Sequence, residues 1–571
     1  MKKLLLIVCS LLFATNLFAQ NTWSEVWTLP EIPFQAEGTL SEYAKVIAGF
    51  DTDEDGWGEF ITGYTDLDSN YVFMYEATGD NTYEMVWYYK FPFSGNSWLG
   101  MTVGDVDNNG KVDIAIGFPS VWSAENVNPP RIFIFEWDKG TTPVGENKYG
   151  MEQLDGTFEP TASTSFDVPD STNWDPYSML IEDVDKDGKN ELVIGVRSGD
   201  RGREVLVASV DGELSFFGTW VIEYNYINDE TGGNFATITG DLDNDGLTDI
   251  FEMVWNKFTL RIHENTGENT YEYVNGLEKV FGPDYGSLDG MHILDANNDG
   301  KNELFICGTE PEMQLFLIQD INDNSAITTN DIIPFYQLPQ NTKPDGGILP
   351  NAALRRMVTG DPDKDGNVNL LIAGEANGQI FDLEYNGTGN LEDDTSWTLN
   401  IIYDLYEVAM NAVGVETASL LTPRLYYGDL ANDMDGDGLA EYVFVNYSTD
   451  RGVWADDRIL SIIEISNTVD VELENNHMPE NIQLSQNYPN PFNPTTNITL
   501  EISSDELVTL TIYDMLGHAV KTLVNQNLTQ GEYRVTWDGK DNSGVTVPTG
   551  TYVYQLKAGD VVKIRKMTYV K

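Results

Sequence analysis

The sequence is poor in cysteine and histidine, with two cysteines and four histidines among its 571 residues. Cys9 lies in an N-terminal segment that we expect to be removed, which leaves Cys307 without a partner for an internal disulfide. The apolar run ELFICGT predicts that Cys307 is buried and is not a nucleophile. No HExxH or GxSxG motif occurs, so these two hydrolase signatures are excluded. We interpret His263 and His292 as structural and predict no catalytic residue.

Long apolar runs are also missing. The run at residues 4–13 follows Lys2 and Lys3 and precedes a small residue, Ala19. It is shorter than the roughly 20 residues that span a bilayer. This layout predicts a secretory signal peptide over residues 1–19, with a membrane anchor as the alternative. No later run is long enough to cross a membrane, so we expect a secreted or outer cell-surface protein without a transmembrane segment.

Positive charge is scarce as well. The chain has 32 Lys and Arg against 92 Asp and Glu, a formal net charge of -60. Residues 481–571 hold eight residues of each sign, so the excess acid lies in the preceding part. Such a surface repels nucleic acid and anionic lipid and attracts divalent cations. With 41% hydrophobic residues, the chain has enough apolar side chains to fold.

One acidic pattern recurs seven times, with the form D-x-[DN]-x-[DN]-G-x-x-[DEN]. The copies begin at Asp51, Asp105, Asp183, Asp241, Asp295, Asp361 and Asp433. Their glycines are 54 to 78 residues apart. Self-similarity at such a period predicts a repeat architecture.

The residues around each acidic loop predict the repeat unit. Short apolar runs precede the loops, β-branched or aromatic runs follow them, and third and fourth strand-like runs come next. No 3.6-residue apolar period occurs between loops, which excludes a helical solenoid. We therefore predict an all-β fold in which residues 20–470 form a seven-bladed β-propeller. The seventh repeat lacks a fourth strand, and residues 21–30 are predicted to supply it.

The loops are suited to calcium. Alternate carboxylates at positions 1, 3 and 5 supply oxygen ligands, glycine at position 6 allows the chain to turn, and an acid at position 9 closes the shell. In an EF-hand the closing acid is at position 12 and helices flank the loop, so these loops are not EF-hands. Magnesium is disfavoured because it prefers a smaller, water-rich shell. A single copy could be an ordinary Asp/Asn/Gly turn, but seven copies in register favour Ca²⁺, with up to one ion per repeat.

The predicted ligands occupy positions 1, 3, 5 and 9. By loop, they are Asp51, Asp53, Asp55 and Glu59; Asp105, Asp107, Asn109 and Asp113; Asp183, Asp185, Asp187 and Glu191; Asp241, Asp243, Asp245 and Asp249; Asp295, Asn297, Asp299 and Glu303; Asp361, Asp363, Asp365 and Asn369; Asp433, Asp435, Asp437 and Glu441. Loops two, five and six replace one carboxylate by an amide, which predicts weaker binding there.

The loops and their flanks resemble the FG-GAP/VCBS repeats of integrin α-subunit propellers and bacterial surface proteins. The resemblance covers about residues 22–466. In that family the calcium loop joins the first two strands of a blade, which is where this sequence places it.

The composition changes after a polar linker at residues 471–481. Short strands with Gly, Asp and Asn turns predict a small Ig-like β-sandwich over residues 482–571. The segments NYPNPFNP, YDMLG and IRKMTYVK resemble the type A C-terminal sorting domain of type IX secretion, and also the Ig-like domain of the flagellar hook-capping protein. Because the module ends a chain with a signal peptide, we favour the sorting domain, which implies the secretion machinery as a partner. A generic Ig-like adhesion module is a further alternative.

Three functions are compatible with the sequence. We favour a calcium-binding surface protein that binds an extracellular protein or polysaccharide in an adhesive role. A carbohydrate-active enzyme resembling polysaccharide lyases is the second hypothesis, with Arg355, Arg356 and Arg424 as candidate basic residues. A structural surface protein is the third. The identity of the ligand does not follow from the fold.

Overall fold

The computed structural model of the chain describes residues 22–30, 42–65, 69–91, 98–118, 130–137, 151–152, 158–166, 174–199, 202–214, 219–228, 234–254, 259–278, 290–307, 313–349, 352–447, 459–466, 471–475, 481–504, 506–513, 515, 517–528, 530–537, 539–540, 547–559 and 561–570. The chain divides into two compact units. One is Trp23–Ile465, and the other contains Ser466–Lys571.

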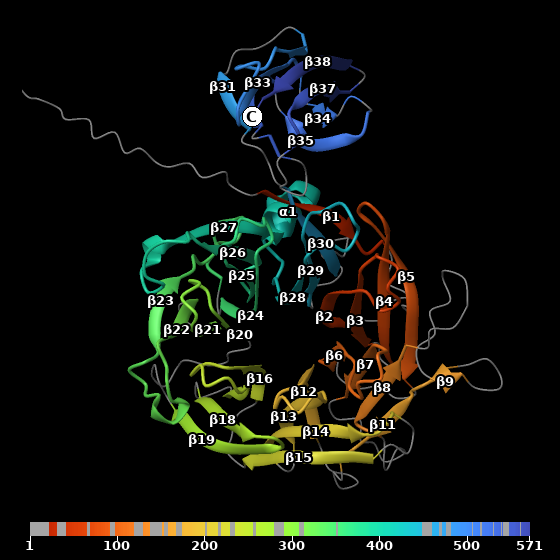
Figure 1. The fold of residues 1–571 in the computed structure, drawn as a ribbon, viewed down its shortest axis with the longest axis vertical. Coiled ribbons are helices and arrows are strands. Elements are labelled where there is room, and N and C mark those ends of the chain that lie inside the picture. The colour runs from red at the N-terminus through yellow and green to blue at the C-terminus, as the bar shows by residue number, and fades with distance from the viewer. Residues whose placement is uncertain are drawn as a thin grey trace, which may run out of the picture. The chain divides into compact units, whose positions relative to one another are not determined.

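The larger unit is a ring of four-stranded antiparallel sheets, the arrangement of a β-propeller (Figure 1). Seven such sheets occur among its described residues. Six of them consist of β2–β5 (Glu42–Phe50, Glu59–Thr65, Asn70–Gly79, Thr82–Phe91), β6–β8 with β11 (Gly100–Gly104, Asp113–Gly117, Ile132–Glu136, Ala162–Thr164), β12–β15 (Trp174–Glu182, Glu191–Gly199, Arg203–Asp211, Thr219–Asn228), β16–β19 (Asn234–Gly240, Asp249–Val254, Thr259–Gly267, Thr270–Glu278), β20–β23 (Met291–Leu294, Glu303–Cys307, Gln314–Ile318, Ile333–Gln337) and β24–β27 (Ala353–Gly360, Asn369–Glu375, Gln379–Tyr385, Trp397–Asp404).

The remaining sheet joins the two ends of the ring. It contains β28 (Leu425–Ala431), β29 (Glu441–Asn446), β30 (Leu460–Ser466) and, beside β30, the N-terminal strand β1 (Thr22–Thr28). The pairing continues at Leu29, whose N–H donates to Leu460 O at 3.0 Å. The predicted completion of the last sheet by the N-terminal segment, given as residues 21–30, is therefore confirmed for residues 22–29.

Position within a sheet explains the composition of each strand. The first strand of every sheet lines the centre of the ring, and the fourth lies outermost (Figure 1). Second and third strands are covered on both faces, so β7 and β17 are buried throughout and are mainly apolar, with Asp113, Asp249 and Glu252 as buried acids. The outermost strand β5 alternates between buried and exposed residues.

Neighbouring sheets share wedges of apolar side chains. Between the first and last sheets, Trp27 of β1 packs edge-on against Phe60, Tyr75 and Tyr83, with ring centroids 5.7–6.0 Å apart. These four aromatic residues pack β1 directly onto the first sheet. The N-terminal strand thus contributes both hydrogen bonds and apolar packing to ring closure.

Two short helices depart from the all-β prediction. They are α1 (Leu405–Val413) and α2 (Val415–Ala418), which precede β28. Asp404 caps α1 by accepting the Tyr406 and Glu407 N–H groups, and Leu405 and Ala409 are buried. Other additions are the 3₁₀ turns η1 (Asn324–Ala326) and η2 (Asp394–Ser396) and a pair of short strands, β9 (Met151–Glu152) and β10 (Phe158–Glu159). In the described part of the chain, no helix combines the length and hydropathy needed for a membrane crossing.

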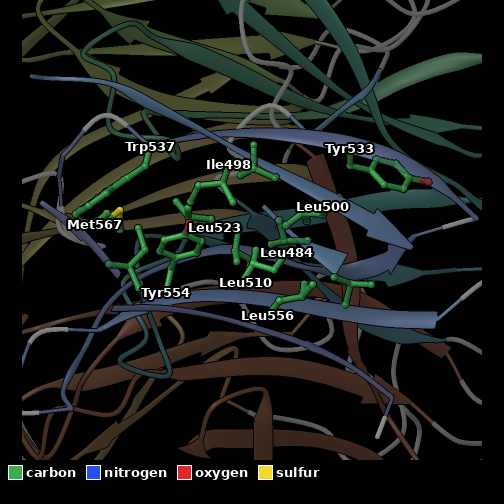
Figure 2. Close-up of a cluster of buried hydrophobic side chains, with 14 of the residues drawn as sticks. Leu484, Ile498, Leu500, Leu510, Leu523, Tyr533, Trp537, Tyr554, Leu556 and Met567 are labelled. Carbon is green, nitrogen blue, oxygen red and sulfur yellow. The ribbon is translucent and has the colours of Figure 1, made fainter. Parts of the chain in front are cut away.

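The second unit consists of two four-stranded antiparallel sheets around one core. The strands are β31 (Val471–Asn475), β32 (Gln483–Leu484), β33 (Thr496–Ile502), β34 (Glu506–Tyr513), β35 (Ala519–Leu528), β36 (Gly531–Trp537), β37 (Gly550–Ala558) and β38 (Val561–Tyr569). The sheet orders are β31-β36-β33-β32 and β35-β34-β37-β38. Leu500 and Trp537 of the first sheet share the core with Leu510 and Tyr554 of the second (Figure 2). β31 lies within the segment predicted as a linker and pairs with β36.

Candidate metal centres

All seven acidic loops adopt the same turn. In each loop the glycine N–H at position 6 donates to the aspartate at position 1, at 2.7–3.1 Å. The N–H at position 7 donates to the side chain at position 5, at 2.7–2.9 Å. The glycines have φ between 85° and 95°, a conformation that L side chains rarely adopt.

Position 4 is also left-handed, a feature that the sequence analysis did not use. Its residues have φ of 56–60° when they are not glycine, and Gly436 has 79°. They are Glu54, Asn108, Lys186, Asn244, Asn298 and Lys364. Asparagine tolerates this conformation better than most residues, and it occupies three of the seven positions. The Asn and Gly residues at position 4 were a readable signal for this turn.

The residue at position 9 closes each loop from the beginning of the second strand. It is 0–2% exposed in all seven loops. In five loops its carboxylate accepts the N–H of position 2 at 2.8–3.0 Å, an interaction made by Glu59, Asp113, Glu191, Glu303 and Glu441. In loop four, Asp249 instead accepts the Asn265 N–H at 2.9 Å and the Asn324 side-chain amide at 2.7 Å.

Several predicted ligand sets converge. In loops three and seven, one oxygen from each of the four predicted carboxylates lies within 4.8 Å of the others. The group in loop one contains Asp51, Asp53 and Glu59. The group in loop two contains Asp105, Asp107 and Asp113. The described carboxylates thus form pockets of oxygen atoms at the sites that the spacing predicted.

The three amide substitutions have different surroundings. The Asn109 Nδ2 donates to Glu136 Oε2 at 2.5 Å, while its Oδ1 accepts the Lys111 N–H. The Asn297 Oδ1 accepts the Asp299 N–H at 2.9 Å. The Asn369 Nδ2 donates to Asp382 Oδ1 at 2.8 Å, on the third strand.

The buried acids provide a test of whether a cation fits. Among the described residues, Asp113 Oδ1, Glu191 Oε1 and Glu441 Oε1 are buried without a hydrogen-bond partner. Burial raises the pKa of every carboxyl at position 9, to about 7 in Glu303, about 9 in Glu441 and about 8 in Glu59, Asp113, Glu191 and Asp249. A divalent cation would supply the missing partner and favour the ionised carboxylates. The donor set therefore fits a hard cation.

A second row of acids, on the third strands, was missed by the sequence analysis. Four position-9 residues face a third-strand glutamate as direct cross-strand partners: Glu59 faces Glu76, Asp113 faces Glu136, Asn369 faces Glu384, and Glu441 faces Glu464. Burial raises the pKa of Glu384 and of Glu464 to about 8. In the three pairs that consist of two acids, like charges are unfavourable unless a cation lies between them. The signal was the glutamate near the end of YVFMYE, RIFIFE, IFDLEY and LSIIE.

The loops also lie at the junctions between sheets. In four of them, a backbone N–H from the outer turn of the next sheet donates to the aspartate at position 3: Asn81 to Asp435 at 2.6 Å, Leu214 to Asp107 at 2.5 Å, Asn324 to Asp243 at 3.3 Å, and Asn269 to Asp185. Asp80 from the first sheet forms a further acidic group with Asp437 and Glu464 of the last. A cation in such a loop would therefore stabilise the contact between two sheets.

His263, His292 and Cys307 are not among the loop residues, and each lies on a strand of the ring. His263 is fully buried and lies between Tyr224 and Glu252, at 2.9 Å from each. His292 contacts Thr359 at 3.0 Å, and burial lowers its pKa to about 4, with a smaller effect from Arg356. Cys307 is buried in the core. The predicted burial of Cys307 is thus confirmed, and His263 and His292 make the hydrogen bonds expected of structural residues.

Two family models match the chain. An FG-GAP-like repeat matches residues 51–116, which contain the first two loops, and a FlgD Ig-like domain matches residues 490–560. Over 67 residues, 12% of this chain, the sequence is 39% identical to the basal-body rod modification protein FlgD of Salmonella typhimurium, and equally to that of Salmonella typhi. The chain spans 29% of the length of these relatives.

Solved structures also resemble the chain. One is BBS1N in complex with ARL6DN, with 12% identity and a TM-score of 0.41, covering 79% of this chain and 100% of that one. Another is the six-bladed β-propeller lectin of Aleuria aurantia, with 11% identity and a TM-score of 0.32, covering 64% of this chain and 98% of the lectin. Similarity at this level supports no functional inference.

The comparison corrects the interpretation of the second unit. We favoured a type IX sorting domain over the hook-capping Ig-like domain, and the matching model is the latter. The physical reason is that the quoted turn segments build the same kind of small β-domain in both families, so they did not separate them. The chain is thus similar to FG-GAP-like repeats in its first part and to the FlgD Ig-like domain in its last.

Proposed function

We propose that this chain is a calcium-binding, seven-bladed β-propeller that acts outside the cytoplasm as a binding or adhesion protein. Each four-stranded sheet is one blade, and each blade carries one loop. The observation that carries the proposal is the repeated convergence of carboxylates at positions 1, 3 and 9, of which the position-9 group is buried. A buried carboxylate beside other acids has a structural reason to be there only if a cation joins them.

Calcium is the cation that this donor set favours. Ca²⁺ accepts six to eight oxygen ligands at about 2.3–2.6 Å in flexible geometry, while Mg²⁺ keeps several waters in a small octahedron. Positions 1, 3, 5 and 9 supply carboxylate or amide oxygens, and third-strand acids such as Glu464 lie beside them. Thiolate and imidazole ligands, which softer metals prefer, are absent from the described loops.

Binding is favoured over catalysis by the surroundings of the ionisable groups. The buried acids are concentrated in the loops, where a coordinated carboxylate is badly placed for proton transfer. The two propeller histidines have hydrogen-bond partners in the core. The expected ligand is an extracellular protein or polysaccharide.

The proposed location is outside the cell or on its outer surface. The positively charged and apolar segments within residues 1–19 support export by a signal peptide. Calcium is millimolar outside cells, which matches the affinity of about 10⁻⁴–10⁻³ M typical of extracellular calcium modules. The second unit, with its separate core, is proposed as an independent module for protein contact.

Calorimetry tests the calcium proposal. The full mature chain is melted after treatment with a chelator, and again in millimolar calcium or magnesium. Calcium should raise the propeller transition by several degrees because it binds the folded state and hardly binds the unfolded chain. A transition that calcium leaves unchanged, or that magnesium raises equally, contradicts the proposal. A glycan and matrix-protein array with the calcium-loaded chain then tests ligand binding.

A further inference from the structure

Aromatic side chains from several sheets meet on the axis of the ring. Trp98 lies two residues before β6, Tyr177 lies on β12, Phe235 on β16 and Tyr426 on β28. Ring centroids lie 5.1 Å apart for Trp98 and Tyr426, and 5.3 Å apart for Tyr177 and Phe235. The sheets of β6 and β28 are separated in the ring by the sheet of β2 (Figure 1). Contact between them is therefore possible only near the axis, where all the innermost strands converge.

Four cationic side chains lie over these rings. Lys45 Nζ is 3.5 Å from the ring centroid of Tyr177. The Cζ atoms of Arg355 and Arg356 are 4.9 Å from the ring centroids of Tyr426 and Tyr427, respectively. Arg197 Cζ is 5.8 Å from the rings of Tyr177 and of Phe235. We call these four cations and the aromatic residues beneath them the axial cluster.

Cations at this place are unexpected from the composition. The whole chain has only 32 Lys and Arg and a net charge of -60. Two carboxylates approach the axial cluster at distances typical of weak ion pairs: Asp429 Oδ1 is 4.0 Å from Arg356 Nη2, and Asp175 Oδ2 is 3.5 Å from Arg197 Nη2. The side chains of Arg197 and Arg356 remain 21% and 27% exposed. These two side chains are therefore partly open to solvent, and aromatic packing sets the orientation of their guanidinium groups.

The geometry suits an anionic group. A guanidinium that lies over an aromatic ring uses its face for that contact, and its N–H donors point outward in its own plane. This planar fork matches the two oxygens of a carboxylate. Three of the four cations lie on first strands, and Arg197 lies on the second strand β13, so the sheets order these donors before a ligand arrives. Preorganised donors lose little entropy on binding.

We propose that the axial cluster binds the carboxylate of a sugar acid, a uronic acid residue at the end of a glycan. A terminal residue is favoured over a polyanion because the acidic propeller repels long runs of negative charge. A rigid sugar ring is favoured over a peptide end because ordering it costs less entropy. The partly exposed rings of Tyr427 and Tyr447 offer apolar surface beside the guanidinium groups.

The axial cluster and the metal loops lie at opposite ends of the innermost strands. Tyr177, Arg355 and Tyr426 are near the beginning of their strands, whereas each acidic loop follows the end of such a strand. The inference rests on the proposed binding function, but the two sites are tested separately. Calcium-dependent melting reports on the loops, and sugar binding reports on the axial cluster.

Isothermal titration with the methyl glycoside of D-glucuronic acid tests the proposal. The calcium-loaded full chain should bind this probe and should not bind methyl glucoside, its neutral counterpart. Arg355→Gln and Arg356→Gln should each weaken binding by about tenfold or more, as expected for a charge-assisted hydrogen bond. Arg356→Lys keeps the charge but loses the planar fork, so it should fall between Arg356→Gln and the unmodified chain. The matched control is Lys90→Gln. Lys90 lies on the outermost strand β5, and its Nζ is 5.3 Å from the ring centroid of Tyr71.

Several results would overturn the proposal. The first is a chain that calcium still stabilises but that does not bind the uronate, and the second is equal affinity for the neutral sugar. The third is an equal loss of uronate affinity in Lys90→Gln, and the fourth is binding of an acidic peptide in place of the uronate. Each variant is first melted in calcium. If an arginine variant melts at a lower temperature than the control, the uronate affinities of Arg356→Lys and Arg356→Gln are compared at a temperature where both are folded. That comparison then decides whether the planar fork contributes to binding. Loss of calcium stabilisation would instead count against the proposed function.

Discussion

Folding buries the carboxyl groups of the position-9 residues, and a carboxyl in such a place must either be protonated or be paired with a cation. Glu59 and Glu441 are buried beside other acids, and burial raises their pKa to about 8 and about 9. In the unfolded chain the same groups titrate near 4.5. Between these values the folded state holds more protons than the unfolded state, so stability falls as pH rises.

This titration predicts a pH dependence of the metal-free protein. In a chelator, the melting temperature of the propeller should fall as pH is raised from about 5 to about 9, because the buried carboxyls lose protons. With millimolar calcium, the same interval should be much flatter, since the ion replaces those protons. Calorimetry at several pH values checks both curves. A chelated protein that becomes more stable between pH 5 and pH 9 would contradict this account.

Single aspartates should not contribute equally to calcium binding. Asp241 belongs to a loop with four carboxylates, and Asp361 to one that is closed by Asn369. With dissociation constants of about 10⁻⁴ and 10⁻³ M, 2 mM calcium stabilises the two loops by about 1.8 and about 0.6 kcal/mol. Asp241→Ala should therefore remove a better-held ion and lower the calcium-loaded melting temperature more than Asp361→Ala. Calcium titration of both variants measures how much calcium binding each substitution removes. Equal losses of calcium binding would show that the number of carboxylates does not set the affinity of a loop.

Between neighbouring strands, Glu464 offers a test of the acid pairs. Glu464→Gln removes one of two buried carboxyls that face each other in β29 and β30. The variant should melt higher than the unmodified chain in a chelator and should gain less from calcium, because the unfavourable pair and the added ligand are both lost. The control is Glu416→Gln, on an exposed face of α2. A lower melting temperature for Glu464→Gln in the chelator would contradict the paired-acid account.

The N-terminal strand can be tested by removal. Without residues 21–30, the edge of β30 would lie open and Trp27 would no longer pack on Phe60. An open strand edge pairs readily with other chains, so the truncated protein should melt lower and aggregate. Light scattering during a thermal melt measures both effects. A monomeric product with an unchanged melting temperature would show that β1 contributes nothing to ring closure.

These strands also show what the sequence could predict and why. β3 and β7 are short, apolar and bounded by turn residues, so their type and order were readable. The sequence analysis missed α1 because this helix is short, lies in an insertion between two repeats and buries only Leu405, Tyr406 and Ala409. The third-strand acids, Glu76 among them, are visible in the sequence, but their role depends on cross-strand register. Contacts such as Lys45 with Tyr177 depend on the closed ring and have no local signal.

At the scale of the whole molecule, charge and packing divide near each other, with the packing boundary at Ser466 and the charge boundary at about residue 480. Most of the excess acid belongs to the propeller, four acids lie between residues 467 and 480, and residues 481–571 are neutral overall. The two units have separate cores, and the second unit begins with β31 rather than after a linker. The natural boundary for a truncation is therefore after Ser466, which preserves β30 and the pairing of β1 with it.

Separate cores predict separate unfolding. A chain that ends at Ser466 should keep the propeller transition, its calcium dependence and its pH dependence, because no acidic loop lies beyond that residue. Residues 467–571 alone should melt as a small domain that is indifferent to calcium, since that segment carries none of the seven loops. Calorimetry of the full chain and both fragments, each with chelator and with calcium, makes the comparison. If the propeller transition shifts by more than a degree or two on truncation, or if the small fragment responds to calcium, the two units are coupled and the independent-module proposal fails.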